Sequence, residues 1–590
     1  MLSTIIQALS LLDRKLKKSW LTLIPLAVTA AVLEVIAVIS VFYLIRTITL
    51  PDQSQITLPF DFFPSTDRQS GSIVVTLCIL IGVIYLVKNS LRLYESFLRE
   101  RCTQQSALTM ASQLLAHYLN GPYSLHYTRN SSELIRNIQN STNAISRNVL
   151  ASATAMCTEI LVCMGVLAVL LYSEPMVTLL AGVSIAAMMG IILIMTQKYH
   201  SLWGKQTHEY GKTLLQTLRQ SLRGIKEIKI LKREEFFIQR YIKQQSQLDR
   251  VTTRRGVLSV LPRLTVETVF ILGVMTIIIS HELWFSNRYE LIPLLGLFTY
   301  AGFRLLPSFH IIVYHWNNIK FGSAALENIQ PDWDQLQQST GSKLPINQHR
   351  IELSQGLEFQ HVCFSYPEGN RQALRDINVS IKKGETIGIV GPTGAGKSTF
   401  IDLLLGLVNP SSGQICIDGK PLNPELWQKL IGYVPQSVYL LDESIARNVA
   451  LGEKQIDELK LHRALESAQL LEFISQLPQG VDTPVGEQGI RLSGGQRQRI
   501  AIARALYHDP QILIFDEATA SLDYKTEQSL IDAVDALHGE KTIIMVAHRL
   551  RTVRHTDRVL FFSEGKLRDT GGFEELNQRN EQFRRIAELE

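Results

Sequence analysis

The chain has 590 residues, of which 46% are hydrophobic and 19% are charged, and its formal net charge is +5. This length excludes a single domain built around one hydrophobic core. The small net charge gives no reason to expect a nucleic-acid partner. The six cysteines show no metal-site spacing, so free thiols are expected. Residues 1–19 are polar and basic without a short apolar core, which argues against a removable signal peptide.

The first half contains six apolar segments, each long enough to cross a bilayer, which takes about 20 residues. They are expected near 21–45, 72–90, 148–172, 176–197, 257–280 and 291–316. Basic residues are sparse in the three short linkers between them and gather in the alternate connections. This positive-inside bias predicts a multi-pass membrane protein with both termini cytoplasmic. The membrane expected is the plasma (bacterial inner) membrane. Buried helices of a soluble protein would not explain six segments with this asymmetry.

The cytoplasmic connections, roughly 91–147 and 198–256, are long, polar and compatible with helices. Each is broken once, at Gly121-Pro122 and at Gly224, where a short transverse helix is expected. The stretch Gly224–Phe237 is amphipathic at helical spacing, so such a helix could dock on a soluble domain. A solvated helical hairpin is an equally open interpretation.

A change in pattern divides the chain into domains. Residues 1–326 are expected to form the transmembrane domain. Residues 327–350 are polar and contain Pro331, Gly341 and Pro345, which is typical of a linker. Short β-rich runs alternate with helices from there on, so residues 351–590 are expected to form an α/β nucleotide-binding domain.

The stretch Gly391–Ser398 fits the phosphate-binding pattern G-x-x-x-x-G-K-[ST]. A β-branched run precedes it and a helix-compatible run follows, which is the context that this loop requires. Lys397 is expected to reach the β- and γ-phosphates of ATP, and the Ser398 hydroxyl to bind Mg²⁺. A glycine-rich turn that binds nothing is the weaker alternative. The expected nucleotide contacts are Gly391, Pro392, Thr393, Gly394, Ala395, Gly396, Lys397, Ser398 and Thr399.

Two further stretches complete the predicted site. Residues 512–517 form an apolar strand that ends in Asp516, expected to hold Mg²⁺, and Glu517, expected to activate the attacking water. Residues 492–496 open a helix, and its N-terminus would form a second anion site. The residues of that turn are Ser493, Gly494, Gly495 and Gln496.

Together these motifs, in their order across 357–575, resemble the ATP-binding cassette (ABC) family. The resemblance implies that Tyr366 stacks on adenine, that Gln436 contacts the metal, and that His548 contacts the γ-phosphate. It also implies that Asp523 lies at a dimer seam, because ATP is sandwiched between two cassettes. The phosphate loop of one cassette would face the Ser493–Gln496 turn of the other. A homodimer is therefore expected, or a pair with a similar chain.

A six-helix domain fused before the cassette resembles the half-transporters among ABC exporters. The fold class expected is an all-α six-helix transmembrane domain plus an α/β P-loop nucleotide-binding domain, the type I ABC exporter architecture. Val485–Gly489 resembles the exporter loop that touches the transverse helices. An ATPase coupled to transport follows from this resemblance, with ATP and Mg²⁺ as cofactors.

Charged residues inside the apolar segments are costly and usually functional. They are Glu34, Glu159, Arg263, Glu267 and Arg304, with Lys88 near a segment end. Ion pairing within the bundle and ligand binding both explain the arginines, and Lys88 could also extend to the interface. The stretches 224–233, 261–263 and 303–308 resemble the lipid-linked-oligosaccharide flippases.

That second resemblance implies that Lys88, Arg263 and Arg304 line a cavity and contact a lipid pyrophosphate. The expected cargo is then an anionic amphiphile, such as a lipid-linked oligosaccharide, moved by alternating access. A multidrug or peptide exporter with the same ATP-hydrolysing cassette is the alternative. A channel or regulatory subunit is disfavoured, because such proteins often lose a catalytic glutamate or signature residue, and both are present here.

Overall fold

The computed structural model describes residues 1–49, 70–173, 175–284, 291–339, 352–366, 372–517, 528, 536–547 and 549–588. The chain forms two compact units. The first, the helical unit, comprises Met1–Gly121 and Arg129–Lys343. The second, the cassette unit, comprises Leu344–Glu590 together with the short segment Pro122–Thr128.

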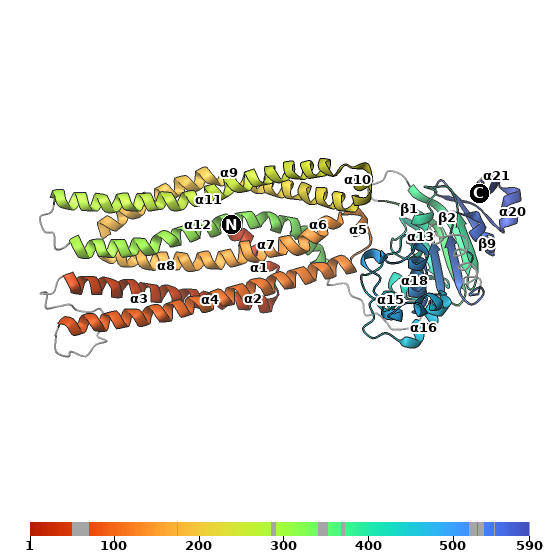
Figure 1. Cartoon of the computed structure of the whole chain (residues 1–590), viewed down its shortest axis with the longest axis horizontal. Helices are drawn as coiled ribbons and strands as arrows, with labels where there is room; N and C mark the ends of the chain where they lie inside the picture. Colours follow the sequence, from red (N-terminus) through yellow and green to blue (C-terminus); the bar gives the residue numbers. More distant parts are fainter. Residues whose placement is uncertain are drawn as a thin grey trace. The chain divides into compact units, whose positions relative to one another are not determined.

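Long helices build the helical unit (Figure 1). Each of the six predicted apolar segments lies mostly within one of them, which agrees with the helical half of the expected fold class. The principal helices are α3 (Leu23–Thr49), α4 (Ser70–Asn120), α8 (Ser152–Ser173), α9 (Pro175–Arg223), α11 (Glu234–Trp284) and α12 (Leu291–Ser339). The shorter elements are α1 (Leu2–Ser10), α2 (Arg14–Leu21), α6 (Ser131–Arg136), η1 (Asn137–Ser141), α7 (Thr142–Ala144), η2 (Ile145–Ala151) and α10 (Ile225–Leu231).

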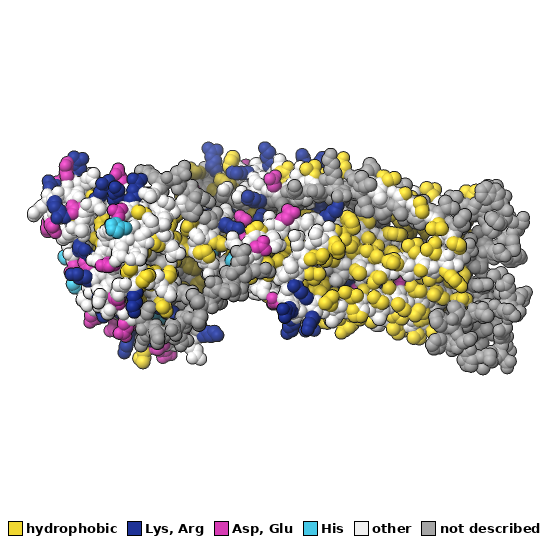
Figure 2. All heavy atoms as spheres, turned by 180° about the vertical axis from the view of Figure 1, so that it is seen from behind, with side chains coloured by type: hydrophobic (Ala, Val, Ile, Leu, Met, Phe, Trp, Pro, Cys, Tyr) yellow, Lys and Arg dark blue, Asp and Glu magenta, His cyan; other side chains and the backbone are white. Residues whose placement is uncertain are grey.

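Apolar side chains cover much of the outside of this unit, and Figure 2 shows them as a broad hydrophobic surface. Leu86 is 71% exposed and Phe303 is 79% exposed. Such a surface is typical of a site that contacts a membrane or another protein. In the described part of the chain, four helical stretches are long and apolar enough to span a membrane, and α11 adds the shorter apolar stretch Leu264–Met275. The four are Arg14–Ile45, Val74–Asn120, Ser131–Tyr172 and Leu295–Leu336.

Two sheets form the cassette unit. The first is antiparallel, in the order β2-β1-β4-β5, with bounds Gln372–Lys382, Gly356–Ser365, Ser412–Ile417 and Lys420–Pro421. The second has the order β10-β9-β3-β8-β7-β6, with bounds Lys566–Gly571, Arg558–Ser563, Thr386–Val390, Thr542–Val546, Ile512–Asp516 and Ile431–Val434. The strands β3, β8 and β7 pair in parallel, and β3 and β8 are buried along their whole length. This explains their continuous apolar sequences.

Helices surround these sheets and supply the loops of the site. Those used below are α13 (Lys397–Leu404), which follows β3, and α18 (Gly494–Leu506), which precedes β7. The others are α14 (Pro424–Trp427), η3 (Gln428–Leu430), α15 (Ile445–Val449), α16 (Glu458–Ser467), α17 (Leu471–Ser475), η4 (Gly480–Asp482), η5 (Glu487–Gly489), η6 (Leu550–Val553), α20 (Phe573–Arg579) and α21 (Glu581–Glu588).

Short helices follow both predicted breaks. Helix α5 (Ser124–Thr128) comes after Gly121-Pro122, and α10 comes after Gly224. The α5 segment belongs to the cassette unit, although the chain on either side of it belongs to the helical unit. The first part of the expected linker 327–350 is helical, because α12 continues to Ser339 and contains Pro331.

Candidate nucleotide site

The phosphate loop joins the buried strand β3 to the first turn of α13. Two of its glycines are required by the backbone. Gly391 has φ +158°, and a Cβ there would lie 2.1 Å from the carbonyl oxygen of Phe562. Gly396 has φ +102°, and a Cβ there would lie 2.8 Å from Leu374 Cδ2. The sequence pattern therefore reflects close backbone packing that only glycine permits.

Lys397 lies across this loop. Its Nζ donates to the carbonyl oxygen of Gly391 at 2.7 Å and to that of Pro392 at 3.2 Å. Burial lowers the pKa of the Lys397 ammonium, and the carboxylates of Glu517 and Asp516 partly offset that effect. The lysine thus sits in a site where positive charge is costly without an anionic neighbour, which suits a phosphate-binding group.

The two predicted carboxylates lie at the end of β7. The hydroxyl of Tyr433 donates to Asp516 Oδ2 at 3.2 Å, and Nε2 of Gln436 donates to Glu517 Oε2. Glu517 has φ +51°, and its N–H donates to the carbonyl oxygen of Val546 at 3.0 Å. Parallel pairing of β6, β7 and β8 brings these groups to one edge of the sheet. The edge that faces Lys397 is therefore acidic.

The donor set suits Mg²⁺, a hard cation that prefers oxygen ligands and usually shares them with substrate phosphates. A hydroxyl from Ser398, an amide from Gln436 and a carboxylate from Asp516 are available. In the described residues no group of three or more His, Cys, Asp or Glu side chains forms a self-sufficient metal site. A cation here would depend on phosphate oxygens as well.

Asp402 is a residue of this region that the motif analysis did not single out. Burial, together with the neighbouring Asp516 carboxylate, raises its pKa to about 6. Ser398 and Asp402 are four residues apart on α13, so both lie on one helical face. The four-residue spacing between Ser398 and Asp402 could have predicted, from the sequence, a third carboxylate near the cation-binding edge.

Tyr366 follows β1 and is half-buried. Its ring packs edge-on against Tyr127 of α5, with centroids 5.6 Å apart, and against Phe364, at 5.0 Å. Its hydroxyl lies 3.2 Å from Oγ1 of Thr399. The aromatic ring is therefore placed beside the phosphate loop, as stacking on a base would require.

The predicted second anion site is the N-terminus of α18. Ser493 is its N-cap: Oγ accepts from the N–H of Gln496 at 3.2 Å, and Oε1 of Gln496 accepts from the N–H of Ser493 at 2.8 Å. This capping box fixes the first turn, which contains Gly494 and Gly495. The helix therefore presents a rigid N-terminus with positive potential.

Three predicted residues lie beyond what the structure describes. His548 and Asp523 are outside the described residues, and the side chain of Arg263 is as well. The catalytic role of His548, the dimer-seam position of Asp523 and the cargo contact of Arg263 stay predictions.

Lys88 and Arg304 of the helical unit are held by carboxylates. Lys88 Nζ lies 3.2 Å from Glu34 Oε1, and Arg304 Nε lies 2.7 Å from the same atom. Arg304 Nη2 lies 3.5 Å from Glu159 Oε2. Arg92, missed at the sequence level, joins through Glu159 at 3.3 Å and Glu34 at 3.9 Å. The ion-pairing interpretation thus describes Lys88 and Arg304 in this structure.

A membrane-spanning helical unit joined to a P-loop cassette defines an ATP-driven membrane transporter. Residues 374–520 match the ABC transporter family, and residues 21–302 match the ABC transporter transmembrane region. The chain belongs to the ABC transporters, and it is an ATP-hydrolysing integral membrane protein of the exporter type.

Individual relatives agree over nearly the whole length. An ABC transporter ATP-binding protein of Sinorhizobium fredii, named as uncharacterized, is 28% identical and covers 88% of each chain. The ATP-dependent lipid A-core flippase of Nitrosococcus oceani is 27% identical over 89% of this chain and 87% of its own. The structure of a bacterial Atm1-family ABC exporter with ATP bound superposes with a TM-score of 0.78 at 22% identity, covering 98% of this chain and 99% of that one. This confirms the predicted fold class.

Proposed function

We propose that this ABC exporter is a homodimeric flippase for an anionic amphiphile, such as a lipid-linked oligosaccharide. The observation that carries the proposal is the group of Lys88, which is buried, and Arg92 and Arg304, which are partly buried, among membrane-spanning helices. Charges at such a place are costly and are retained for function. The names of full-length relatives, lipid A-core flippases, support a lipid-borne cargo.

The dimer proposal is supported by the cassette and by α10. The N-terminus of α18 is preformed as an anion site, and the family sandwich would place it on ATP held by a second chain. On α10, Ile230 and Leu231 are 70% and 66% exposed. Apolar side chains exposed on a polar cytoplasmic extension suit docking on a second cassette.

In the proposed cycle, two ATP molecules close the cassette pair and hydrolysis reopens it. Lys397 binds the phosphates, Asp516 and Ser398 would hold Mg²⁺, and Glu517 takes a proton from the attacking water. Gln436, bonded to Glu517, orients that carboxylate. Mg²⁺ would neutralise the charge that develops on the phosphates. In this proposal the protein lies in a bacterial inner membrane, with both termini and the cassettes on the cytoplasmic side.

The test is ATP-driven flipping in liposomes. Purified protein is reconstituted with a fluorescent polyprenyl-pyrophosphate-linked sugar, and loss of label from one leaflet is followed with and without ATP. We expect ATP-dependent movement for wild type and none for Glu517→Gln. Movement of apolar cations or peptides instead, with the lipid left in place, would contradict the proposed cargo and favour a drug or peptide exporter.

A further inference from the structure

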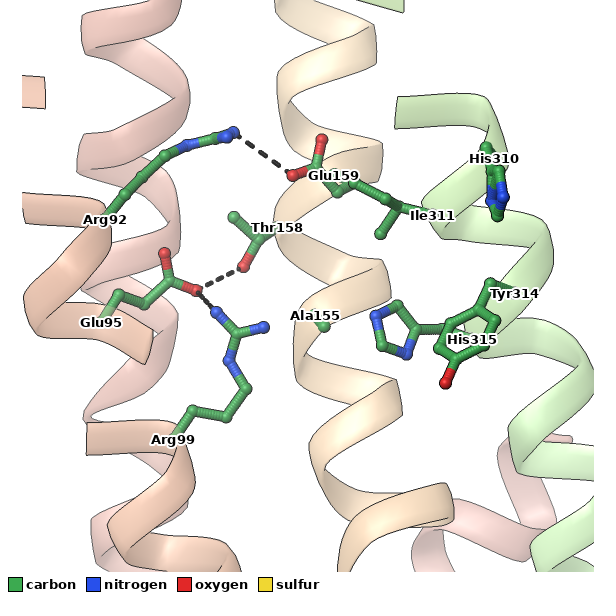
Figure 3. A pocket seen from close by; sticks show the side chains of 10 residues that line it. All are labelled: Arg92, Glu95, Arg99, Ala155, Thr158, Glu159, His310, Ile311, Tyr314 and His315. Atoms are coloured by element: carbon green, nitrogen blue, oxygen red, sulfur yellow. Dashed lines mark hydrogen bonds and ion pairs between the residues drawn. The ribbon is translucent and has the colours of Figure 1, made fainter. Parts of the chain in front are cut away.

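A cavity of about 500 Å³ lies within the helical unit, between α4, α8 and α12 (Figure 3). Its size is within the usual range for a ligand headgroup. Arg92 and Arg99 enter from α4, and His315 enters from α12. Glu95 of α4 and Glu159 of α8 also line the cavity. The cavity thus combines charged and polar groups with the apolar side chains of Ala155 and Ile311.

The described charges around this cavity do not balance. Four cationic side chains meet three carboxylates, which leaves one positive charge in excess. The cations are Lys88, Arg92, Arg99 and Arg304, and the carboxylates are Glu34, Glu95 and Glu159. All three carboxylates are buried. An uncompensated charge in such surroundings is costly, so the cluster is electrostatically suited to one more anion.

The two carboxylates that line the cavity, Glu95 and Glu159, already accept hydrogen bonds. Glu95 Oε1 accepts from Arg99 Nη2 at 2.9 Å and from Thr158 at 2.9 Å. Glu159 accepts from Arg92 Nη2 at 3.3 Å and from Ser308 at 2.6 Å. The carboxylates are therefore already shared between cations and hydroxyls.

Three nitrogens at the cavity are left over. Nε of Arg92, Nε of Arg99 and Nδ1 of His315 are buried and have no hydrogen-bond partner among the residues that the structure describes. Both guanidinium nitrogens are obligatory donors, and the imidazole nitrogen donates when it carries a proton. Leaving buried donors unpaired is costly. One more negatively charged acceptor, beyond Glu95 and Glu159, would pair these donors.

Helix α4 also presents an apolar side at this level. Leu93 and Phe97 are 74% and 61% exposed, whereas Arg92, Glu95 and Arg99 lie toward the cavity at helical spacing. One helix thus carries a polar cavity on one side and an exposed apolar surface on the other. This arrangement fits a ligand whose charged end enters the cavity while its hydrocarbon chain stays in lipid.

We propose that this cavity, and not the Lys88–Arg304 cluster alone, receives the cargo headgroup and that it binds a phosphoryl oxyanion through Arg92, Arg99 and His315. The inference rests on the proposed function where it identifies the ligand as transported cargo. The binding site itself does not depend on that function. Guanidinium groups suit a phosphoryl group because they donate several hydrogen bonds in a fixed plane. The same chemistry could come from a lipid or from free phosphate.

The test is calorimetric titration of the full-length, nucleotide-free protein in phosphatidylcholine nanodiscs. Three probes are compared: farnesyl phosphate, inorganic phosphate and uncharged farnesol. The main variant is Arg92→Lys/Arg99→Lys, which keeps both positive charges beside the carboxylates but removes both Nε donors. Arg101→Lys, at an exposed position of the same helix, is the matched control.

We expect farnesyl phosphate to bind the double variant about tenfold more weakly than wild type, because charge-assisted hydrogen bonds are lost. The Arg101→Lys control should bind like wild type. His315→Phe, which leaves every ion pair intact, should also weaken binding and serves if the double variant fails to fold. If the affinity for inorganic phosphate falls in the same variants, the oxyanion site is supported. The bound oxyanion can then come from free phosphate.

Equal affinity in wild type, the double variant and His315→Phe would overturn the site, and so would farnesol binding as tightly as farnesyl phosphate. Binding does not depend on transport. If wild type flips the lipid in liposomes while the variants bind unchanged, the headgroup site is wrong and the proposed function stands. If the site binds the phosphate probe but no lipid moves, the proposed function fails and the site stands.

Discussion

Glu517 and Lys397 show what single residues contribute to the proposed chemistry. Lys397 is a buried ammonium whose charge is unfavourable without anions nearby, and Glu517 is fixed by Gln436 next to it. The lysine therefore favours binding of phosphates, while the glutamate is held where a water could be deprotonated. Binding and hydrolysis should be separable by mutation because different side chains carry them.

The substitution Glu517→Gln should lower ATP turnover on the order of 10²–10³-fold while ATP binding is retained. The amide preserves the shape of the side chain and its bond to Gln436 but cannot take a proton. Phosphate release and equilibrium ATP binding are measured on the same reconstituted preparation. Lys397→Ala is the comparison, since it should weaken binding itself. Wild-type turnover in the Glu517→Gln variant would remove this residue as the general base.

Asp402 predicts a pH dependence of stability. Its pKa is raised to about 6 by burial and by Asp516, so the folded chain binds a proton that the unfolded chain releases above about pH 4. Stability from this group therefore falls as pH rises from about 4 to about 6, and the whole penalty is present above that window. Asp402→Asn removes the penalty.

Calorimetric unfolding of full-length, nucleotide-free protein tests this. At pH 7.5 the Asp402→Asn variant should unfold about 2–4 °C higher than wild type, and the difference should vanish near pH 4. Asp442, at an exposed position, gives the control Asp442→Asn. A difference that stayed constant across the pH range would show that ionisation of Asp402 is not its cause.

Most of the cassette could be predicted at the level of elements, because its motifs require particular backbone geometry. The phosphate loop needs Gly391 and Gly396 where side chains would collide, and β7 must be apolar because it is buried. The partners of the intramembrane charges could not be predicted. Lys88 and Glu34 are 54 residues apart, and their contact depends on how α3 packs on α4.

The end of a helix could be predicted only where the amino-acid composition changes at the same residue. The linker assignment of 327–350 followed a polar composition and Pro331, but α12 continues to Ser339. Packing of Ile329 and Trp333, both buried, outweighs the local cost of that proline. The break at Gly121-Pro122 predicted a short helix, but the grouping of α5 with the cassette unit was not predicted, because docking was considered only for Gly224–Phe237.

Glu34 is the contact point of three helices, α3, α4 and α12, through Lys88 and Arg304. Glu34→Gln should destabilise the helical unit by about 3–5 kcal/mol, because it leaves buried cations without their partner. The midpoint of heat-induced aggregation in detergent should fall accordingly. Glu267→Gln, on an exposed position of α11, is the matched control. Equal midpoints for the two variants would show that the ion pairs do not hold these helices together.

At the scale of the whole molecule, the proposal requires two chains. One cassette contains both the phosphate loop and the α18 turn, yet the family arrangement uses the loop of one chain with the turn of the other. Exposed apolar residues on α10 and the preformed α18 N-terminus support this. A homodimer would then contain two equivalent sites, each built from both chains.

The most direct measurement is ATPase activity of two purified heterodimers, each isolated by different affinity tags on its two chains. One pairs a Lys397→Ala chain with a Ser493→Arg chain, and the other pairs wild type with a chain that carries both substitutions. Sites shared between chains leave one intact site in the first heterodimer and none in the second, so only the first should hydrolyse ATP. Activity in the second heterodimer and not in the first would contradict the shared site.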